Sequence, residues 1–393
     1  MNHVDICSNF MPSRLEHLSR TLEGYKLTSI PFIEYHENTF SPCITADDIG
    51  IYYFIPKIAC FFQLPIEQAI VLFFNSIALI SCVLGIIGFF LLYKGWLERT
   101  IAALGLIALT LFVCSITLDV YRVFHAVAVP VVPWSLYFCQ KKYSSRFFYL
   151  FMVLSGSAVS LAHYIRLHSG TAVIIFIGLL LVAHPYLTYY RKMMLISLLG
   201  LGFILPMGYF HYVYSCHVDY VAQHFPGQQA DQEQHVFWHQ VYIGFGFLSN
   251  DLGISFADRV AHNKALTVNP LVTYPSQESE QILKHEVMKL IRTQKYFTFI
   301  TWGAKVGVLL FFLLVFANIG LLVAFLYPKR WYIDCAFAAA LGFNSLFAIF
   351  TIPYFLYCLG FITFAALYGI VSLNYGIEHG LVKNIFRKWK KLV

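Results

Sequence analysis

The sequence predicts an all-α, polytopic membrane protein, and three observations lead to that fold class. First, 59% of the 393 residues are hydrophobic, only 12% are charged, and the mean hydropathy is positive, unlike an ordinary soluble domain. Second, the apolar runs approach the roughly 20 residues that a helix needs to cross a bilayer, whereas the strands of an outer-membrane barrel are short and alternating. Third, the net charge of +7 comes from short basic clusters between these runs, a pattern that indicates topology and argues against a nucleic-acid-binding face.

About nine apolar runs are candidate membrane spans. In chain order they cover approximately residues 69–93, 101–118, 123–139, 147–163, 169–188, 193–213, 303–327, 331–352 and 354–374. The third contains Pro130 and Pro133, which we expect to bend or break it, or to leave a kinked span sealed by its neighbours. These runs divide the chain into an N-terminal region (1–68), a six-span module (69–213), a polar segment (214–302), a three-span module (303–374) and a basic tail (375–393).

Basic residues gather in alternate loops, as expected for cytoplasmic loops, which are enriched in Lys and Arg. They are Lys94, Arg99, Lys141, Lys142, Arg146, Arg191, Lys192, Lys329, Arg330 and the tail residues Lys383, Arg387, Lys388, Lys390 and Lys391. This assignment places segments 1–68 and 214–302 on the extracytoplasmic side, where Arg122 and Arg166 are exceptions to the charge rule. Because an exported N-terminal region ordinarily follows a span, we expect either a span upstream of this sequence or an N-terminus tucked into the membrane.

An acidic pair, Asp47 and Asp48, runs into an aromatic segment (49–56) just ahead of the first span. Two carboxylates at a membrane surface are costly unless they have partners or a task. A carboxylate partly withdrawn from water is suited to act as a general base toward a hydroxyl or an amine. The alternative is that one or both cap the helix that begins near Ile49, since Asp is a favoured N-cap residue.

A short outer connection between the fourth and fifth runs carries His163, Arg166 and His168. Its charges must lie at the membrane–water boundary, where the guanidinium fork of Arg166, with either histidine, is suited to hold an anionic phosphate. The alternative is that Arg166 reaches toward lipid headgroups. Arg122 is a second phosphate candidate, or it pairs with Asp119 three residues earlier on a helix face.

The polar segment 214–302 contains one clear helical pattern, over residues 276–290, with Ser276 as its cap and with Glu278 and Glu280 near the positive end of its dipole. A segment of this size suffices for a small helical cap over a cavity and is short for an independent enzyme domain. We therefore expect it to cover a site on the membrane domain.

Four further residues are candidates for contacts with a substrate. Asn250 and Asp251 lie in a predicted turn. Their side chains either contact a sugar or only stabilise the turn by hydrogen bonding to its backbone. His239 lies on a polar surface of the same segment and is a candidate contact for an acceptor or a sugar. Lys305, at the outer end of the seventh run, faces a phosphate or anchors the span at the interface.

The acidic first loop, with its interfacial aromatic segment, the multi-span body and the external segment between later spans, resembles the GT-C superfamily of integral-membrane glycosyltransferases, such as protein mannosyltransferases and aminoarabinose transferases. The resemblance implies a sugar donor on a polyprenyl phosphate, an acceptor that is a glycan, a lipid or a protein, and a location in a bacterial inner membrane. It implies that Asp47 or Asp48 is the base and that Arg166 is the leading phosphate ligand.

The sequence departs from this family in three ways: the usual first span is absent, the chain is shorter than most members, and no Asp-x-Asp motif occurs. The last departure predicts a metal-independent enzyme without a cofactor. A transporter or flippase, in which the same Arg and His residues bind a head group, remains an alternative, as does a ligase of lipid-linked oligosaccharides. The single large external segment breaks the symmetry that alternating-access transporters usually show and so favours an enzyme.

Overall fold

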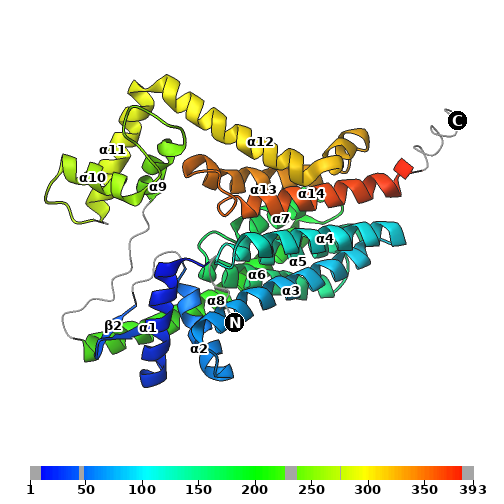
Figure 1. Ribbon diagram of the computed structural model, residues 1–393. Coiled ribbons are helices and arrows are strands. Elements are labelled where there is room, and N and C mark those ends of the chain that lie inside the picture. Colours follow the sequence, from blue (N-terminus) through cyan, green and yellow to red (C-terminus); the bar gives the residue numbers. More distant parts are fainter. Residues whose placement is uncertain (1–9, 44–47, 226–236, 275, 383–393) are drawn as a thin grey trace, which may run out of the picture.

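A computed structural model describes residues 10–43, 48–225, 237–274 and 276–382. Within these ranges eight helices are long and apolar enough to cross a membrane (Figure 1). They are α3 (Ile66–Leu92), α4 (Trp96–Ile116), α5 (Arg122–Lys141), α6 (Phe147–Ile165), α8 (Tyr189–His224), α12 (Lys295–Leu326), α13 (Trp331–Phe350) and α14 (Leu359–Glu378). The predicted fold class, a polytopic helical membrane protein, is confirmed.

The fifth expected run, 169–188, forms only a short helix, α7 (Thr171–Val182). At about 1.5 Å per residue, its 12 residues span roughly 18 Å, less than the hydrocarbon core of about 30 Å. It nevertheless connects the two ends of the bundle, because His184, just after it, hydrogen bonds to the Cys139 carbonyl near the end of α5 (2.7 Å). Half of the residues of α7 are buried, mainly against α13 and α5, so protein covers one side of this short helix.

The interior of the bundle is formed mainly by α5 and α14, the most buried of the eight long helices. Large apolar side chains on the outer helices face outward, among them Leu79 (65% exposed) and Leu314 (62%), as expected for surfaces that contact lipid. Despite Pro130 and Pro133, α5 is one continuous helix. The interrupted helix is α12, where Asn318 adopts a positive φ of 46°.

An N-terminal module precedes the first long helix. It comprises α1 (Pro12–Thr28), a two-stranded antiparallel hairpin of β1 (Ile33–His36) and β2 (Thr39–Pro42), and α2 (Ile49–Phe62). The hairpin pairs Ile33 with Pro42, and the turn residues Glu37 and Asn38 both have positive φ, the geometry that a tight two-residue turn requires. Because α1 packs against β1, α2 and α3, the module is attached to the end of the bundle.

A second small module lies between α8 and α12. It contains α9 (Phe237–Gly244), the 3-10 turn η1 (Phe245–Phe247), α10 (Asp258–Val268) and α11 (Gln277–Thr293), packed around their own apolar cluster. The predicted helix over 276–290 is confirmed as α11, and Ser276 caps it by accepting a hydrogen bond from the Ser279 amide (3.1 Å). We call this module the cap.

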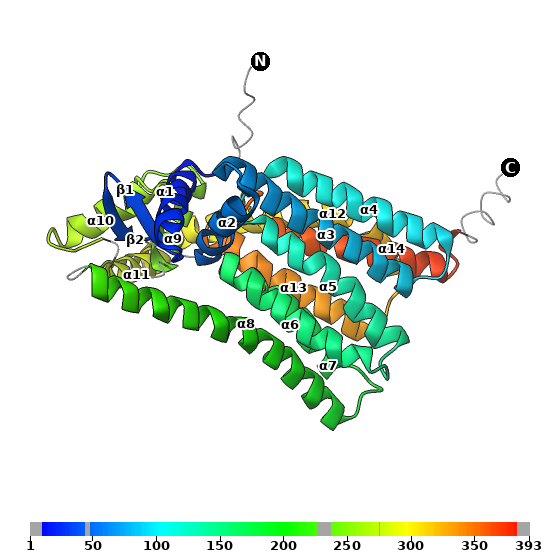
Figure 2. The same cartoon turned by 90° about the horizontal axis from the view of Figure 1, so that it is seen from below.

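The N-terminal module and the cap lie at the same end of the bundle (Figures 1 and 2). The loops that carry the basic clusters, such as those after α3, α5 and α12, lie at the other end. The alternation expected from the charge pattern is therefore present in the fold. The two modules stand over the ends of the spanning helices that are opposite the basic loops, and the candidate site lies between them.

Candidate functional site

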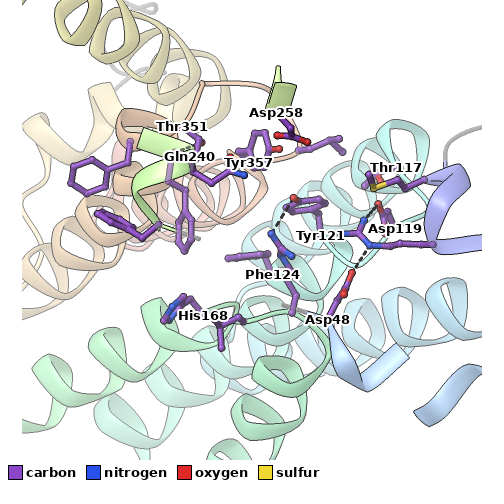
Figure 3. Close-up of a pocket in the computed structure, with 18 of the residues that line it drawn as sticks. Asp48, Thr117, Asp119, Tyr121, Phe124, His168, Gln240, Asp258, Thr351 and Tyr357 are labelled. Carbon is purple, nitrogen blue, oxygen red and sulfur yellow. Dashed lines mark hydrogen bonds and ion pairs between the residues drawn. The ribbon is translucent and has the colours of Figure 1, made fainter. Parts of the chain in front are cut away.

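A cavity of about 1320 Å³ occupies the boundary between the helix bundle and the two modules (Figure 3). Its walls come from α1, α2, the α4–α5 and α6–α7 connections, the cap, and the α13–α14 connection. Because these elements are far apart in the chain, the cavity exists only in the folded protein. Its size is that of a site for a substantial ligand.

An arginine from α1 joins two carboxylates at one side of the cavity. Arg14 donates from Nε to Asp48 and from Nη1 to Oδ2 of Asp119 (2.7 Å). Side-chain exposure is 13% for Arg14 and 7% for each aspartate, so all three charges are largely withdrawn from water. Asp119 also accepts from the Val120 amide (2.7 Å), whereas Oδ1 of Asp48 makes no hydrogen bond within the described ranges.

The charges of this group influence one another. Burial alone would lower the pKa of the Arg14 guanidinium, but the negative charges of Asp48 and Asp119 outweigh burial and raise it. Burial raises the pKa of Asp119, and the attraction of Arg14 offsets this only in part. The carboxyl of Asp119 therefore binds a proton more readily than an ordinary aspartate does.

A second wall carries basic and aromatic groups from the α6–α7 connection. Arg166 donates to the Tyr121 hydroxyl (3.2 Å) and lies over its ring, 4.9 Å from the centroid. His168, which lines the cavity, adopts a positive φ of 65°, and its amide donates to Nδ1 of His163 (3.2 Å). His163 thus supports this connection without lining the cavity, and Arg166 and His168 are the basic residues of the connection that line it.

The cap contributes an acidic wall. Asp258, the first residue of α10, lines the cavity, and its side chain is 83% exposed. One of its oxygens accepts a hydrogen bond from Nε2 of His239 (2.9 Å), and the other ring nitrogen of His239 pairs with the Tyr274 hydroxyl. His239 is itself 3% exposed. The buried imidazole therefore fixes the orientation of an exposed carboxylate.

The fourth wall is apolar. Four residues of α13 line the cavity: Phe343, Leu346, Phe347 and Phe350. Because α13 is one of the spanning helices, and Leu346 is 41% exposed, this wall brings apolar side chains of the bundle against the polar cavity. Such a wall suits a ligand with both a charged head and an apolar chain.

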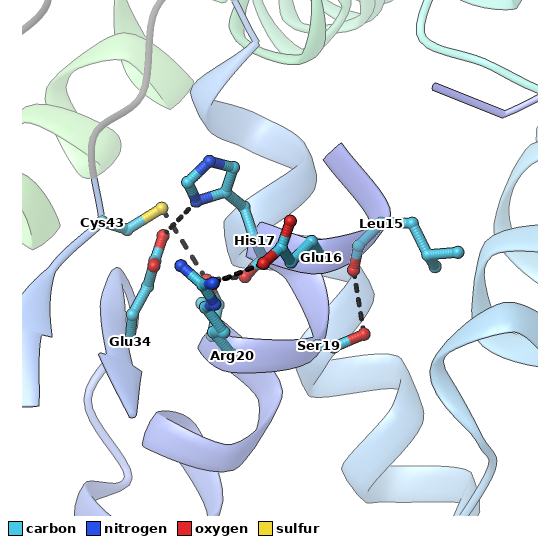
Figure 4. Close-up of polar contacts among 8 residues, drawn as sticks. Leu15, Glu16, His17, Ser19, Arg20, Glu34 and Cys43 are labelled. Atoms are coloured by element: carbon cyan, nitrogen blue, oxygen red, sulfur yellow. Dashed lines mark hydrogen bonds and ion pairs between the residues drawn. The ribbon is translucent and has the colours of Figure 1, made fainter. Parts of the chain in front are cut away.

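Figure 4 shows a polar cluster formed by residues of α1, by Glu34 of β1 and by Cys43, which directly follows β2. His17, which lines the cavity one turn after Arg14, pairs through Nδ1 with Oε1 of Glu34 (2.8 Å). The carboxylate accepts, so Nδ1 carries the hydrogen. Glu34 is 5% exposed, and the nearby Thr21 hydroxyl contacts the Cys43 thiol (3.7 Å). This cluster orients His17 and fixes α1 to the hairpin.

Of the residues that the sequence singled out, Asp48, Arg166 and His168 meet in the cavity. Asp47 lies outside the described residues. Although α2 begins at Ile49 as expected, the Asp48 side chain does not cap it through any hydrogen bond among the described residues and binds Arg14 instead.

Arg122 lies apart from the cavity lining. It is 3% exposed, and its guanidinium donates to the carbonyls of Thr117 and Cys114 and to Asn75 (2.5 Å). It thereby satisfies the end of α4, where helix carbonyls lack intrahelical partners. Asp119 pairs with Arg14 rather than with Arg122, so the expected pair within one helix face is replaced by a long-range one.

Lys305 and the turn residues also lie outside the cavity lining. Lys305 is 1% exposed and donates to the carbonyls of Ile349 (2.9 Å) and Thr351 (2.5 Å) at the end of α13. The Asn250 side chain bonds to the backbone of its own loop, including the Ile254 carbonyl (2.8 Å), which is ordinary turn chemistry. Asp251 is exposed in the same turn.

The sequence did not single out Arg14 or Asp258. It predicted that His239 contacts an acceptor or a sugar, but Asp258 lines the cavity and His239 does not. One signal was present: a carboxylate beside a membrane implies a cationic partner, and Arg14 is a cation in the same N-terminal region. In the part of the chain that the structure describes, no group of three or more His, Cys, Asp or Glu residues is placed to hold a metal ion. Comparison with protein-family models, curated proteins and solved structures finds no match.

Proposed function

We propose that the chain is a GT-C-type membrane glycosyltransferase that transfers a sugar from a polyprenyl-phosphate donor to an acceptor on the extracytoplasmic face of the plasma membrane. The observation that carries the proposal is that the candidate base, Asp48, and the candidate phosphate ligands, Arg166 and His168, come from distant parts of the chain and line one cavity. Each of these residues was predicted independently of the others, from charge and topology, so their presence in one cavity supports the proposal.

The walls of the cavity match the parts of such a donor. The guanidinium of Arg166 is suited to a phosphate, and His168 adds a second polar contact. The apolar wall of α13, from Phe343 to Phe350, offers a path for the lipid chain toward the membrane. Asp258 on the cap is placed to accept hydrogen bonds from the hydroxyl groups of a sugar or an acceptor.

The reaction is a direct displacement. An acceptor hydroxyl or amine attacks the anomeric carbon and gives its proton to Asp48, while the bond from that carbon to the phosphate oxygen breaks. The electron pair leaves with the phosphate, whose charge Arg166 stabilises, and polyprenyl phosphate is released. Because the attack occurs in one step, the anomeric configuration is inverted.

The side of the membrane follows from the charges. Basic loops lie at the end of the bundle opposite the cavity, and Lys and Arg are enriched in cytoplasmic loops. The cavity then faces the extracytoplasmic side, where polyprenyl-phosphate sugars would reach it within the membrane.

The donor class is tested by identifying the lipids that copurify with the protein by mass spectrometry. We expect a polyprenyl phosphate, with or without a sugar, to copurify with the wild type and to be depleted in Arg166→Gln. Arg259→Gln is the matched control, because Arg259 is exposed on α10 and outside the cavity lining. Ordinary phospholipid alone, unchanged by Arg166→Gln, would contradict the assignment.

A further inference from the structure

Two buried carboxylates share a single arginine at the candidate site. Arg14 bonds to Asp48 through Nε and to Asp119 through Nη1, and the three side chains are 7–13% exposed. Two carboxylates held close together in a site of low polarity do not both ionise readily without a cation, because each disfavours the charge of the other. Removal of Arg14 would therefore leave a pair that retains a proton at higher pH.

Neighbouring groups do not replace this cation. On α1, His17 is bonded to Glu34, a residue of β1 that lies beside Cys43. On α2, Tyr52 lies near Asp48 and adds no positive charge. Arg166 contacts Tyr121 and attracts Asp119 less strongly than Arg14 does. Arg14 is thus the dominant positive charge at the pair.

We propose that Arg14 is the positioning residue of the base: its guanidinium bonds to Asp48 and Asp119 at once, and its positive charge offsets the repulsion between the two carboxylates, so that Asp48 is held in place as a proton acceptor. The description of Asp48 as a base rests on the proposed function, whereas the electrostatic role does not. Arg14 belongs to α1, which packs on the hairpin and on α2. The position of the base is consequently coupled to the docking of the N-terminal module.

The first test measures thermal stability against pH in detergent and requires no transfer assay. Burial already raises the folded-state pKa of Asp119, and Arg14 opposes that rise. In Arg14→Gln this opposition is lost, so the folded-state pKa of Asp119 rises further above the unfolded value of about 3.9. The stability that protonation supplies is present below the unfolded pKa and is lost as pH rises through the folded pKa. The Tm deficit of Arg14→Gln relative to the wild type should therefore grow from about pH 5 to about pH 8.

Two further variants separate charge from packing. Arg14→Lys keeps the positive charge and should follow the pH dependence of the wild type. The double variant Arg14→Gln/Asp119→Asn removes one of the two repelling carboxylates and should lose the growing deficit. A deficit in Arg14→Gln that is constant with pH would show that Arg14 only fixes α1 to the bundle and would overturn the proposal.

The second test follows transfer, measured as the release of polyprenyl phosphate, against pH. The acidic limb of the profile should move to higher pH in Arg14→Gln. The factor by which the variant's transfer rate falls below that of the wild type should therefore be roughly tenfold or more larger at about pH 6 than at about pH 8. Arg14→Lys should restore the position of the limb, and an unmoved limb in Arg14→Gln would contradict the proposal. If the wild type shows no transfer while the Tm signature is present, the glycosyltransferase function fails and the charge arrangement stands.

Discussion

Replacement of Gly50 by Ala should disturb the geometry of the site through a single added methyl group. Gly50 lies two residues after Asp48, where α2 crosses the end of α6. A Cβ at this position would lie 2.7 Å from the Tyr164 carbonyl oxygen and 2.9 Å from the Ile165 Cα. Ordinary contact begins at 3.4 Å, so the shortest distance falls 0.7 Å short. Both opposing atoms belong to backbone, and α2 must therefore move away from α6.

That movement would separate Asp48, which directly precedes α2, from Arg166, which directly follows α6. A misplacement of about 1 Å can cost roughly 100-fold in rate, and forcing an extra methyl into a tight contact costs about 1–3 kcal/mol. We expect Gly50→Ala to lower Tm and to reduce the release of polyprenyl phosphate by up to about 100-fold. Thermal unfolding and a transfer assay in detergent measure the two effects.

The matched control is Gly200→Ala on α8, where no described atom lies within 4 Å of the added Cβ. Because alanine is intrinsically better than glycine in a helix by roughly 0.5–1 kcal/mol, this control should keep or slightly raise Tm and retain activity. If Gly50→Ala behaves like Gly200→Ala, the close contact between α2 and α6 does not position Asp48, and the reasoning is refuted.

Three other substitutions test the acidic wall that the cap contributes and the structural role of Lys305. Asp258→Asn should raise the KM for the sugar donor or the acceptor by about tenfold or more, because a hydrogen bond to a charged group contributes about 1.5–3 kcal/mol; unchanged steady-state constants would remove Asp258 from the site. His239→Phe should have a smaller effect in the same direction, since His239 acts through Asp258. Lys305→Met should lower Tm, because it leaves the carbonyls of Ile349 and Thr351 without their hydrogen-bond donor. Each unsatisfied buried carbonyl lowers the free energy of unfolding by about 1–3 kcal/mol. An unchanged Tm would contradict this structural role.

Much of the fold followed from hydropathy and charge. Long apolar runs predicted the spanning helices, and the alternation of basic loops predicted which loops share an end of the bundle. Hydropathy reports only the part of a helix that meets hydrocarbon, so it missed the extension of α8 to His224 and the early start of α12 at Lys295. It also could not show that α7 is short, because a helix packed against protein carries the same apolar residues as one that faces lipid.

The site was only partly accessible from sequence. Asp48, Arg166 and His168 stand out because charges at a membrane boundary are costly, and they do meet in the cavity. Arg122 and Lys305 have the same sequence signature but satisfy helix-end carbonyls, a role that only tertiary contacts reveal. Arg14 and Asp258 sit among other polar residues, where nothing in the local pattern distinguishes a cavity residue from a solvated one.

The most direct test of the central claim is the release of polyprenyl phosphate from a panel of polyprenyl-phosphate sugars, measured by mass spectrometry for the wild type and for Asp48→Asn. The account predicts release by the wild type and a loss of about 100-fold to 10,000-fold in Asp48→Asn. Asp219→Asn, an exposed aspartate outside the cavity lining, should retain activity, and Asp47→Asn shows whether the neighbouring carboxylate shares the role. Full release by Asp48→Asn, or movement of the lipid across the membrane by a wild type that releases no polyprenyl phosphate, would contradict the account.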